Sequence, residues 1–338
     1  MATGKVARRA GVTDVAALLD SPEVEALIAS IEAVGDKRGR KGFGTRALVG
    51  ACLVKSLFAL PTWTWVAALI AEHPGLQEKL GASPSVWACY RFATKLRKNH
   101  PLLVECIDSV AAALREQYPD FGKDVAIDAS DLPAFANGQR YVSQHGPERE
   151  RFSDPDASWG HRSAVSTRKG GGFYGYKLHL GVCTATGLPL AWRVETARRN
   201  ESLYLAPLLD AMHARGFRPE TCAADKGYDH PRVYAECEQR GCDPVIPMRG
   251  VKGKQVVLPI ATGGRLFPRI PRHSDRFRTL YRRRASVERA FGDLKHGYGL
   301  SPLRVRGLER VALHADLVML GRLGQALSRA REAVPLAA

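Results

Sequence analysis

The sequence lacks the features that mark several large protein classes. None of its seven cysteines forms a Cys-x-x-Cys pair, and several lie in apolar runs, as reduced core thiols do, which argues against a zinc site or a disulfide framework. The basic N-terminal residues are not followed by the apolar segment of a secretory signal, and no apolar run spans a bilayer comfortably. Internal repeats are also missing. We therefore expect a cytoplasmic globular protein without membrane segments.

Acidic residues are few relative to basic ones. The chain has 50 Lys and Arg against 34 Asp and Glu, a formal net charge of +16, and a pI near 9.8. Such an excess favours a polyanionic partner, with nucleic acid as the leading candidate, although a basic surface that only aids solubility is the alternative. The basic residues are concentrated between Arg269 and Arg310. In this stretch we expect DNA contacts from Arg282, Arg283, Arg304 and Arg306.

The first third of the chain has the periodicity of helices. Apolar residues recur at helical spacing from about Val12 to Tyr118, which predicts an all-α domain over residues 1–119. Within it, a short helix around residues 74–80 leads through a Gly-containing turn to a segment that carries Arg91 and Lys95. Two helices in this arrangement, the second basic, are typical of a helix-turn-helix that enters the DNA major groove. A helix pair with an ordinary polar face is the alternative.

Beyond residue 120 the pattern changes to short strands and Gly-rich turns. Strands are expected near 125–127, 174–182, 188–194, 221–224 and 243–247, and helices at 200–212, 231–239, 281–298 and 308–332. Residues 136–171 are polar and aperiodic, which predicts a long loop or insertion. This order predicts a mixed α/β fold over residues 120–338, with a five-stranded sheet flanked by helices.

The segment from Tyr281 to Lys295 has a spacing typical of a functional site. On one continuous helix, Tyr281, Arg284, Glu288 and Lys295 would lie within a sector of roughly 60°, beside an apolar stripe that can be buried. A phenol, a carboxylate and two cations would then point in one direction. The alternative is a solvated ion-pair face, because Arg284 and Glu288 are four residues apart.

Two further acids lie where this fold could bring them to Glu288. Asp128 is on the first strand and faces away from Ile127, and Asp225 follows the fourth strand. Three clustered carboxylates repel one another unless a cation lies among them. Mg²⁺ or Mn²⁺ prefers oxygen ligands, and two such ions about 4 Å apart can support phosphoryl transfer. Asp128 and Asp225 could instead be ordinary turn carboxylates.

These motifs resemble those of the bacterial insertion-sequence DDE transposases that carry the YREK signature. The resemblance rests on Ile127-Asp128-Ala-Ser, on Ala224-Asp225-Lys-Gly-Tyr228-Asp and above all on Tyr-x2-Arg-x3-Glu-x6-Lys between Tyr281 and Lys295. It covers roughly residues 120–325, in the family's order. Relatives often have Asp-Gly-Thr or Asp-Ser-Thr where this chain has Asp-Ala-Ser, and the carboxylate is kept.

The resemblance implies an RNase H-like catalytic domain in which Asp128, Asp225 and Glu288 bind two Mg²⁺ or Mn²⁺ ions. It also implies that Tyr281, Arg284 and Lys295 hold DNA phosphates beside the metals. Such an enzyme cuts transposon ends at their inverted repeats and joins the 3′ hydroxyls to target DNA. It would act as a homodimer on DNA, in the cytoplasm at the nucleoid.

Two other functions stay open, as do the roles of several residues outside the motifs. The chain could be an RNase H-like nuclease or resolvase that only hydrolyses DNA, or a catalytically silent, domesticated DNA-binding protein. Lys177 is a candidate DNA contact, whereas its neighbour His179 is expected to face solvent. Glu201 is interpreted as a helix start, with an approach to the metal site as the alternative. Trp65 and Trp192 are expected in the core.

Overall fold

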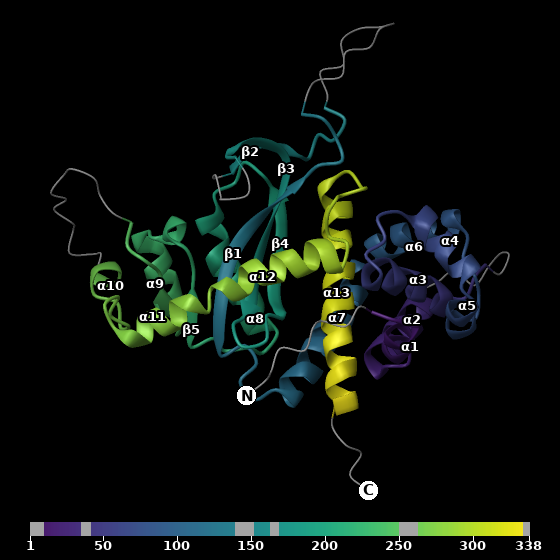
Figure 1. Cartoon of the computed structure of the whole chain (residues 1–338), viewed down its shortest axis with the longest axis horizontal. Coiled ribbons are helices and arrows are strands. Elements are labelled where there is room, and N and C mark those ends of the chain that lie inside the picture. Colours follow the sequence, from purple (N-terminus) through teal and green to yellow (C-terminus); the bar gives the residue numbers. More distant parts are fainter. Residues whose placement is uncertain (1–9, 35–41, 139–151, 163–168, 250–262, 334–338) are drawn as a thin grey trace, which may run out of the picture. The chain divides into compact units, whose positions relative to one another are not determined.

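The computed structural model describes residues 10–34, 42–138, 152–162, 169–249 and 263–333 (Figure 1). The chain divides into two compact units, which we call unit 1 (residues 1–117 and 292–338) and unit 2 (residues 118–291). This division differs from two consecutive domains, 1–119 and 120–338, because the C-terminal segment packs with the N-terminal helices. The functional boundary near residue 119 stays a prediction. None of the described helices combines the length and apolarity needed to cross a membrane.

Unit 1 is helical, which confirms the predicted all-α N-terminal region. Its elements are α1 (Val12–Leu19), α2 (Pro22–Ala33), α3 (Thr45–Leu57), α4 (Trp63–Glu72), α5 (Pro74–Leu80), α6 (Val86–Lys98), α7 (His100–Gln117), the π-helical segment η4 (Asp293–Gly297) and α13 (Leu308–Ala333). Side-chain caps begin several of these helices. Ser85, for example, accepts a hydrogen bond from the amide of Ala88 at the start of α6.

The C-terminal helix α13 completes the core of unit 1. It packs against α7 and α3 (Figure 1). Most of the residues on its inner face are buried and apolar. Two glycines permit this close packing. A Cβ atom on Gly321 would lie 2.9 Å from the Cβ of Ser56, and one on Gly324 would lie 2.4 Å from Leu18 Cδ1. Unit 1 is therefore built from both ends of the chain.

Unit 2 has a mixed sheet flanked by helices, which confirms the predicted α/β class. Its strands are β1 (Asp124–Pro133), β2 (Ser158–Arg162), β3 (Gly171–Cys183), β4 (Pro189–Thr196), β5 (Thr221–Ala223) and β6 (Asp243–Val245). Its helical elements are η1 (Glu201–Tyr204), α8 (Leu205–Ala214), η2 (Lys226–Tyr228), α9 (Pro231–Gln239), α10 (Gly263–Leu266), α11 (Asp275–Arg282) and α12 (Ala285–Gly292).

The sheet order is β2-β3-β1-β5-β6, with β4 also paired to β3. β3 is antiparallel to β1 and β4, whereas β5 is parallel to β1 and to β6. α8 packs on β3 and β4, and α9 and α11 pack near β6 (Figure 1). The parallel pairing of β1 and β5 matters for function, because it brings the ends of two strands with acidic residues to the same region of the sheet.

The prediction of five strands was wrong by one. β2 lies inside the expected loop 136–171 and pairs antiparallel with the first half of β3. Its sequence, Ser-Trp-Gly-His-Arg, lacks an apolar alternation, and its residues are only partly buried. This edge strand is held by its backbone pairing and by hydrogen bonds such as that between the Thr196 and Ser158 hydroxyls. Residues 139–151 and 163–168 of the expected loop lie outside the described residues.

The expected continuous helix from residue 281 to 298 is interrupted. α11 ends at Arg282, α12 begins at Ala285, and a π-helical segment follows α12. At the junction the amides of Arg283 and Arg284 donate to carbonyls only three residues earlier. Tyr281 therefore lies in the last turn of α11 and Glu288 lies in α12, so the four signature residues do not share one continuous helix.

Several smaller expectations were also corrected. His179 is buried rather than solvent-facing, and its ring stacks on Tyr204 with 4.0 Å between centroids. Trp65 is exposed, not in the core. Trp192 is partly buried beneath the guanidinium of Arg215. Asn200 caps a 3₁₀ turn that precedes α8, so the helix begins later than expected.

Candidate active site

Asp128 lies in the middle of β1, and Asp225 follows the end of the neighbouring strand β5 in unit 2. β1 and β5 pair in parallel with Asp124 opposite Thr221 and Ala126 opposite Ala223, and both acids follow within two residues of the paired stretch. Asp225 caps η2 by accepting a hydrogen bond from the amide of Gly227 at 2.7 Å. Its negative charge raises the pKa of Asp128. The topology thus brings two of the three predicted acids into electrostatic contact.

The carboxyl group of Asp128 is held in an environment that disfavours its charge. Burial raises its pKa to about 7, and this is the largest effect. A hydrogen bond from the amide of Ala129, 2.8 Å from Oδ1, lowers the pKa, whereas Asp225 raises it, Arg284 lowers it and Glu201 raises it. The negative charges of Asp225 and Glu201 thus act against the favourable effects of Ala129 and Arg284 on the charged form of Asp128.

Arg284 joins the first and third predicted acids. Its guanidinium lies 3.3 Å from Oδ2 of Asp128 and 2.5 Å from Oε1 of Glu288. The same group lies 5.8 Å from the ring centroid of Tyr281, whose ring stacks on Phe277. Tyr281, Arg284 and Glu288 are thus together, as the spacing predicted, although the helix that should have carried them is broken.

The donor atoms around Asp128 are carboxylate oxygens, the ligand type that a hard divalent cation prefers. Among the residues that the structure describes, however, three His, Cys, Asp or Glu side chains are nowhere arranged as a finished metal site. Glu288 is largely exposed and paired with Arg284, which supplies the positive charge that a metal ion would bring. Crowded carboxylate oxygens with a raised pKa are the setting in which Mg²⁺ or Mn²⁺ is preferred. Asp128, Asp225 and Glu288 could hold it after a rearrangement of Arg284.

Glu201 is a fourth carboxylate near Asp128. It begins η1, five residues after the end of β4, and its charge raises the pKa of both Asp128 and Tyr228. Its Oε1 is 2.6 Å from the ammonium of Lys177, a largely buried side chain on β3. Lys177, which we expected to contact DNA, is therefore paired with an acid of its own unit. The signal in the sequence was an acid directly after the N-cap residue Asn200.

Tyr228 is a functional candidate that the sequence reasoning did not identify. It is only 1% exposed, and its hydroxyl has no hydrogen-bond partner among the described residues. Burial raises the pKa of this phenol, and Asp128, Glu201 and Asp225 raise it further. η1 packs against η2, which brings this tyrosine close to Glu201. The one available signal was its place in the Asp-Lys-Gly-Tyr-Asp motif.

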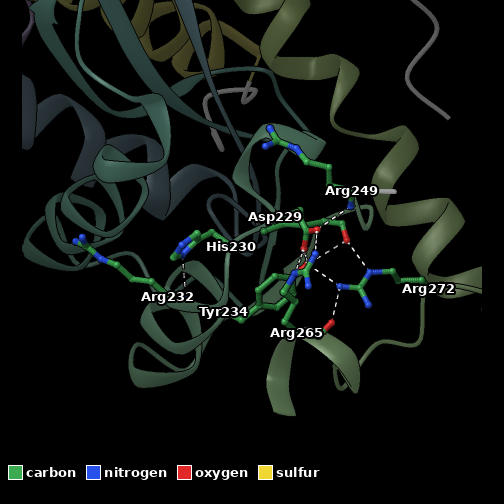
Figure 2. A network of polar contacts seen from close by, with 8 residues as sticks. Asp229, His230, Arg232, Tyr234, Arg249, Arg265 and Arg272 are labelled. Carbon is green, nitrogen blue, oxygen red and sulfur yellow. Dashed lines mark hydrogen bonds and ion pairs between the residues drawn. The ribbon is translucent and has the colours of Figure 1, made fainter. Parts of the chain in front are cut away.

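The turn that carries Asp225 and Tyr228 is fixed by a buried polar network (Figure 2). Asp229 accepts hydrogen bonds from the Arg265 guanidinium at 2.8 and 2.5 Å and from the amide of Arg249 at 2.7 Å. Burial alone would raise the pKa of Asp229, but these bonds lower it. Arg272 donates to the Tyr234 hydroxyl at 2.6 Å. The segment after β6 thus braces η2 against movement.

The other predicted DNA contacts are divided between the units. In unit 2, Arg282 is exposed, and Arg283 is exposed but lies 2.9 Å from Asp124. In unit 1, Arg304, Arg306 and Arg91 are exposed, Lys295 is half-buried in η4, and Lys95 is half-buried with its ammonium donating to the carbonyl of Ile31 at 3.0 Å.

Unit 2 therefore combines a mixed sheet, acids on or directly after two adjacent strands, and a glutamate linked to one of them by an arginine. Comparison with known families is more specific. Residues 119–322 match the model described as Transposase DDE domain, and the chain belongs to this family. It is 31% identical over 169 residues to the "Putative transposase for insertion sequence element IS402" of Burkholderia cepacia, covering 45% of this chain and 77% of that relative. No solved structure matches significantly.

Proposed function

We propose that this protein is a DNA transposase that binds the terminal inverted repeats of an insertion sequence, cleaves the ends and joins their 3′ hydroxyls to target DNA. The observation that carries the proposal is the linkage of Asp128 and Glu288 by Arg284, with Asp225 near enough to raise the pKa of Asp128. Family membership supports the same reaction class.

In this proposal the three acids hold two Mg²⁺ or Mn²⁺ ions, with Glu201 as a further negative charge beside them. Bound divalent ions supply the charge that activates a nucleophilic oxygen and stabilises the leaving oxygen of the scissile phosphate. Arg284 neutralises Asp128 and Glu288 before DNA arrives and turns to a DNA phosphate afterwards. Tyr281 supports Arg284 with its ring, and Lys295 provides another phosphate contact, as in the resembling family.

The proposed partners follow from charge. A net charge of +16 suits DNA, and the exposed Arg282, Arg304 and Arg306 are proposed phosphate contacts. Joining two transposon ends in one reaction requires two active sites, so we propose a homodimer on DNA. The protein would then work where its DNA is, at the nucleoid in the cytoplasm.

The test is an assay of cleavage and joining. Purified protein with Mg²⁺ or Mn²⁺ should cut duplexes taken from the DNA on either side of the reading frame and join them to a plasmid, and EDTA should stop both steps. Asp225→Asn and Glu288→Gln should each reduce cleavage at least a thousandfold while leaving DNA binding intact. Asp210→Asn is the matched control, because this exposed acid on α8 pairs with Arg240 and is not one of the acids near Asp128.

Three results separate the alternatives. Cleavage at the wild-type rate by either site variant would refute the assigned roles. Cleavage without joining, even with free 3′ hydroxyl ends supplied, would favour a nuclease or resolvase that only hydrolyses. Binding without cleavage under all metal conditions would favour a catalytically silent DNA-binding protein.

A further inference from the structure

Helix α6 of unit 1 exposes an unusual face. Trp87, Tyr90, Arg91, Thr94 and Lys98 are all exposed, and at about 100° per residue they lie within a sector of about 100°. We call these five residues the α6 face. Trp87 is 72% exposed and Tyr90 is 46% exposed, with their ring centroids 6.0 Å apart.

Exposure of this aromatic pair is unfavourable unless a partner covers it. The opposite face of α6 already supplies the core contacts of the helix, through Ala88, Cys89, Phe92 and Leu96. Trp87 and Tyr90 are therefore not needed to anchor α6 in unit 1. Large aromatic side chains that lie together on a surface commonly mark an interaction site.

The charge of α6 indicates what kind of partner this is. The helix contains Arg91, Lys95, Arg97 and Lys98 and no acidic residue. Arg97 lies 3.5 Å from Glu309, and Lys95 donates to the Ile31 carbonyl. Arg91 and Lys98 are the cations that belong to the exposed α6 face. Aromatic rings bordered by cations complement a polyanion with apolar surface, which describes the groove and backbone of duplex DNA better than an acidic protein surface.

We propose that the α6 face is a DNA-binding surface on which Trp87 and Tyr90 make apolar contacts with sugars and thymine methyl groups while Arg91 and Lys98 bind phosphates. This proposal rests on the proposed function and adds the contacting residues. α5, the turn after Gly81 and α6 have the order of a helix-turn-helix, in which the N-terminal part of the second helix reads the groove. Lys95, the other cation expected there, is a positioning residue that ties α6 to α2.

The experiment compares salt dependence among full-length variants. The probes are duplexes of about 40–60 base pairs from the DNA flanking the reading frame, and the control probe is a scrambled duplex of equal composition. The affinity of each variant for both probes is measured at several salt concentrations. Each phosphate contact contributes about 0.9 to the slope of log affinity against log salt, whereas an apolar contact contributes nothing. Trp87→Ala and Tyr90→Ala should therefore weaken binding about tenfold with the slope unchanged.

The basic residues should behave differently from the aromatic ones. Arg91→Ala and Lys98→Ala should each lower the slope by about one, and Lys95→Ala should leave it unchanged apart from an effect on thermal stability. Trp159→Ala is the matched control, because this exposed tryptophan also forms a ring pair but belongs to unit 2. Its affinity should stay within about twofold of wild type.

Three outcomes would overturn the proposal. The first is wild-type DNA affinity in both Trp87→Ala and Tyr90→Ala, and the second is a loss of affinity in Trp159→Ala equal to theirs. The third is a Trp87→Ala or Tyr90→Ala variant that no longer self-associates but keeps its DNA affinity, which would make the α6 face a contact between copies of this chain. If Trp87→Ala binds and joins DNA as well as wild type does, this inference alone is refuted. Wild-type protein that neither binds nor cuts the flanking DNA would refute the proposed function itself.

Discussion

At the scale of single residues, the surroundings of Asp128 change its protonation in the pH range where the protein would bind a metal ion. Its pKa of about 7 means that a proton and a metal ion compete for the same oxygens near neutral pH. The folded protein keeps this proton at pH values where the unfolded chain, with its ordinary Asp pKa of 3.8, has lost it. The contribution of Asp128 to the stability of the metal-free protein therefore falls as the pH rises between these two values and is level above pH 7, whereas the buried His179 and His314, whose pKa values burial lowers to about 3, contribute with the opposite sign.

Metal affinity should have the opposite pH dependence. We expect binding of Mn²⁺ to strengthen by up to about tenfold per pH unit below pH 7, where each bound ion displaces a proton, and to level off above it. Calorimetric titration across this range measures the effect, and thermal unfolding without metal measures the fall in stability. Relative to Asp128→Asn, wild type should lose stability as the pH rises over this range, because only wild type has this proton to lose. Affinity that does not change with pH below 7 would contradict the assigned role of Asp128.

Removal of the buried Tyr228 hydroxyl should affect the stability of the metal-free protein and the stabilisation by a bound metal ion in different ways. An unsatisfied buried hydroxyl is destabilising, so Tyr228→Phe should leave the metal-free protein equally stable or more stable by up to about 1–3 kcal/mol. If the hydroxyl orients the carboxylates around a cation, the same variant should gain less stability than wild type when Mn²⁺ is added. Denaturant unfolding with and without Mn²⁺ measures both effects.

Tyr234→Phe is the control for this experiment. Its hydroxyl accepts a hydrogen bond from Arg272 and lies 3.1 Å from Asp229, so this variant should lose about 1–2 kcal/mol with or without Mn²⁺. A loss of stability in metal-free Tyr228→Phe similar to that of the control would show that the Tyr228 hydroxyl is structural.

At the scale of elements, the helices with clear end signals could be predicted from the sequence. The ranges 74–80 and 231–239 were predicted as they are found, because a His N-cap and a Pro at the first position mark each start. β2 could not be predicted, because its stability comes from pairing with β3 and not from its own residues.

The break between α11 and α12 could not be predicted from the spacing of residues along the chain, because that spacing does not record tertiary contacts. Neither Pro nor Gly lies at the junction. Tyr281 packs against a cluster around Phe277 and Ile270, whereas Arg284 is directed to Asp128 on a distant strand. These two tertiary contacts need different backbone directions, so the helix bends between them. The pairing of Arg284 with Glu288 could be predicted from their separation of four residues, and Arg284 bridging to Asp128 could not.

At the scale of the whole molecule, unit 1 depends on both ends of the chain. The apolar face of α13 packs on α3 and α7, with residues such as Leu320, Leu323 and Leu327 fully buried. The sequence predicted α13 as a helix but gave no sign of which unit would cover it, because helical periodicity records that a face is buried and not what buries it.

A fragment experiment tests this composition. Residues 1–117 alone should fail to unfold cooperatively and should bind a hydrophobic dye, because the faces of α3 and α7 that α13 covers become exposed. The same residues joined by a flexible linker to residues 292–338 should give a cooperative thermal transition. Circular dichroism and calorimetry measure the difference. A cooperative transition of the short fragment at the temperature of the joined one would refute the role of α13.

The position of α13 also has a consequence for biosynthesis. While a ribosome is still translating unit 2, the emerging N-terminal helices lack their last packing partner, and they can close their core only after residues 308–333 have left the exit tunnel. A polypeptide released early would then lack a stable α6 surface. If the α6 face binds DNA as proposed, such truncated chains would not compete with full-length chains for the DNA, even though they already carry Asp128, Asp225 and Glu288.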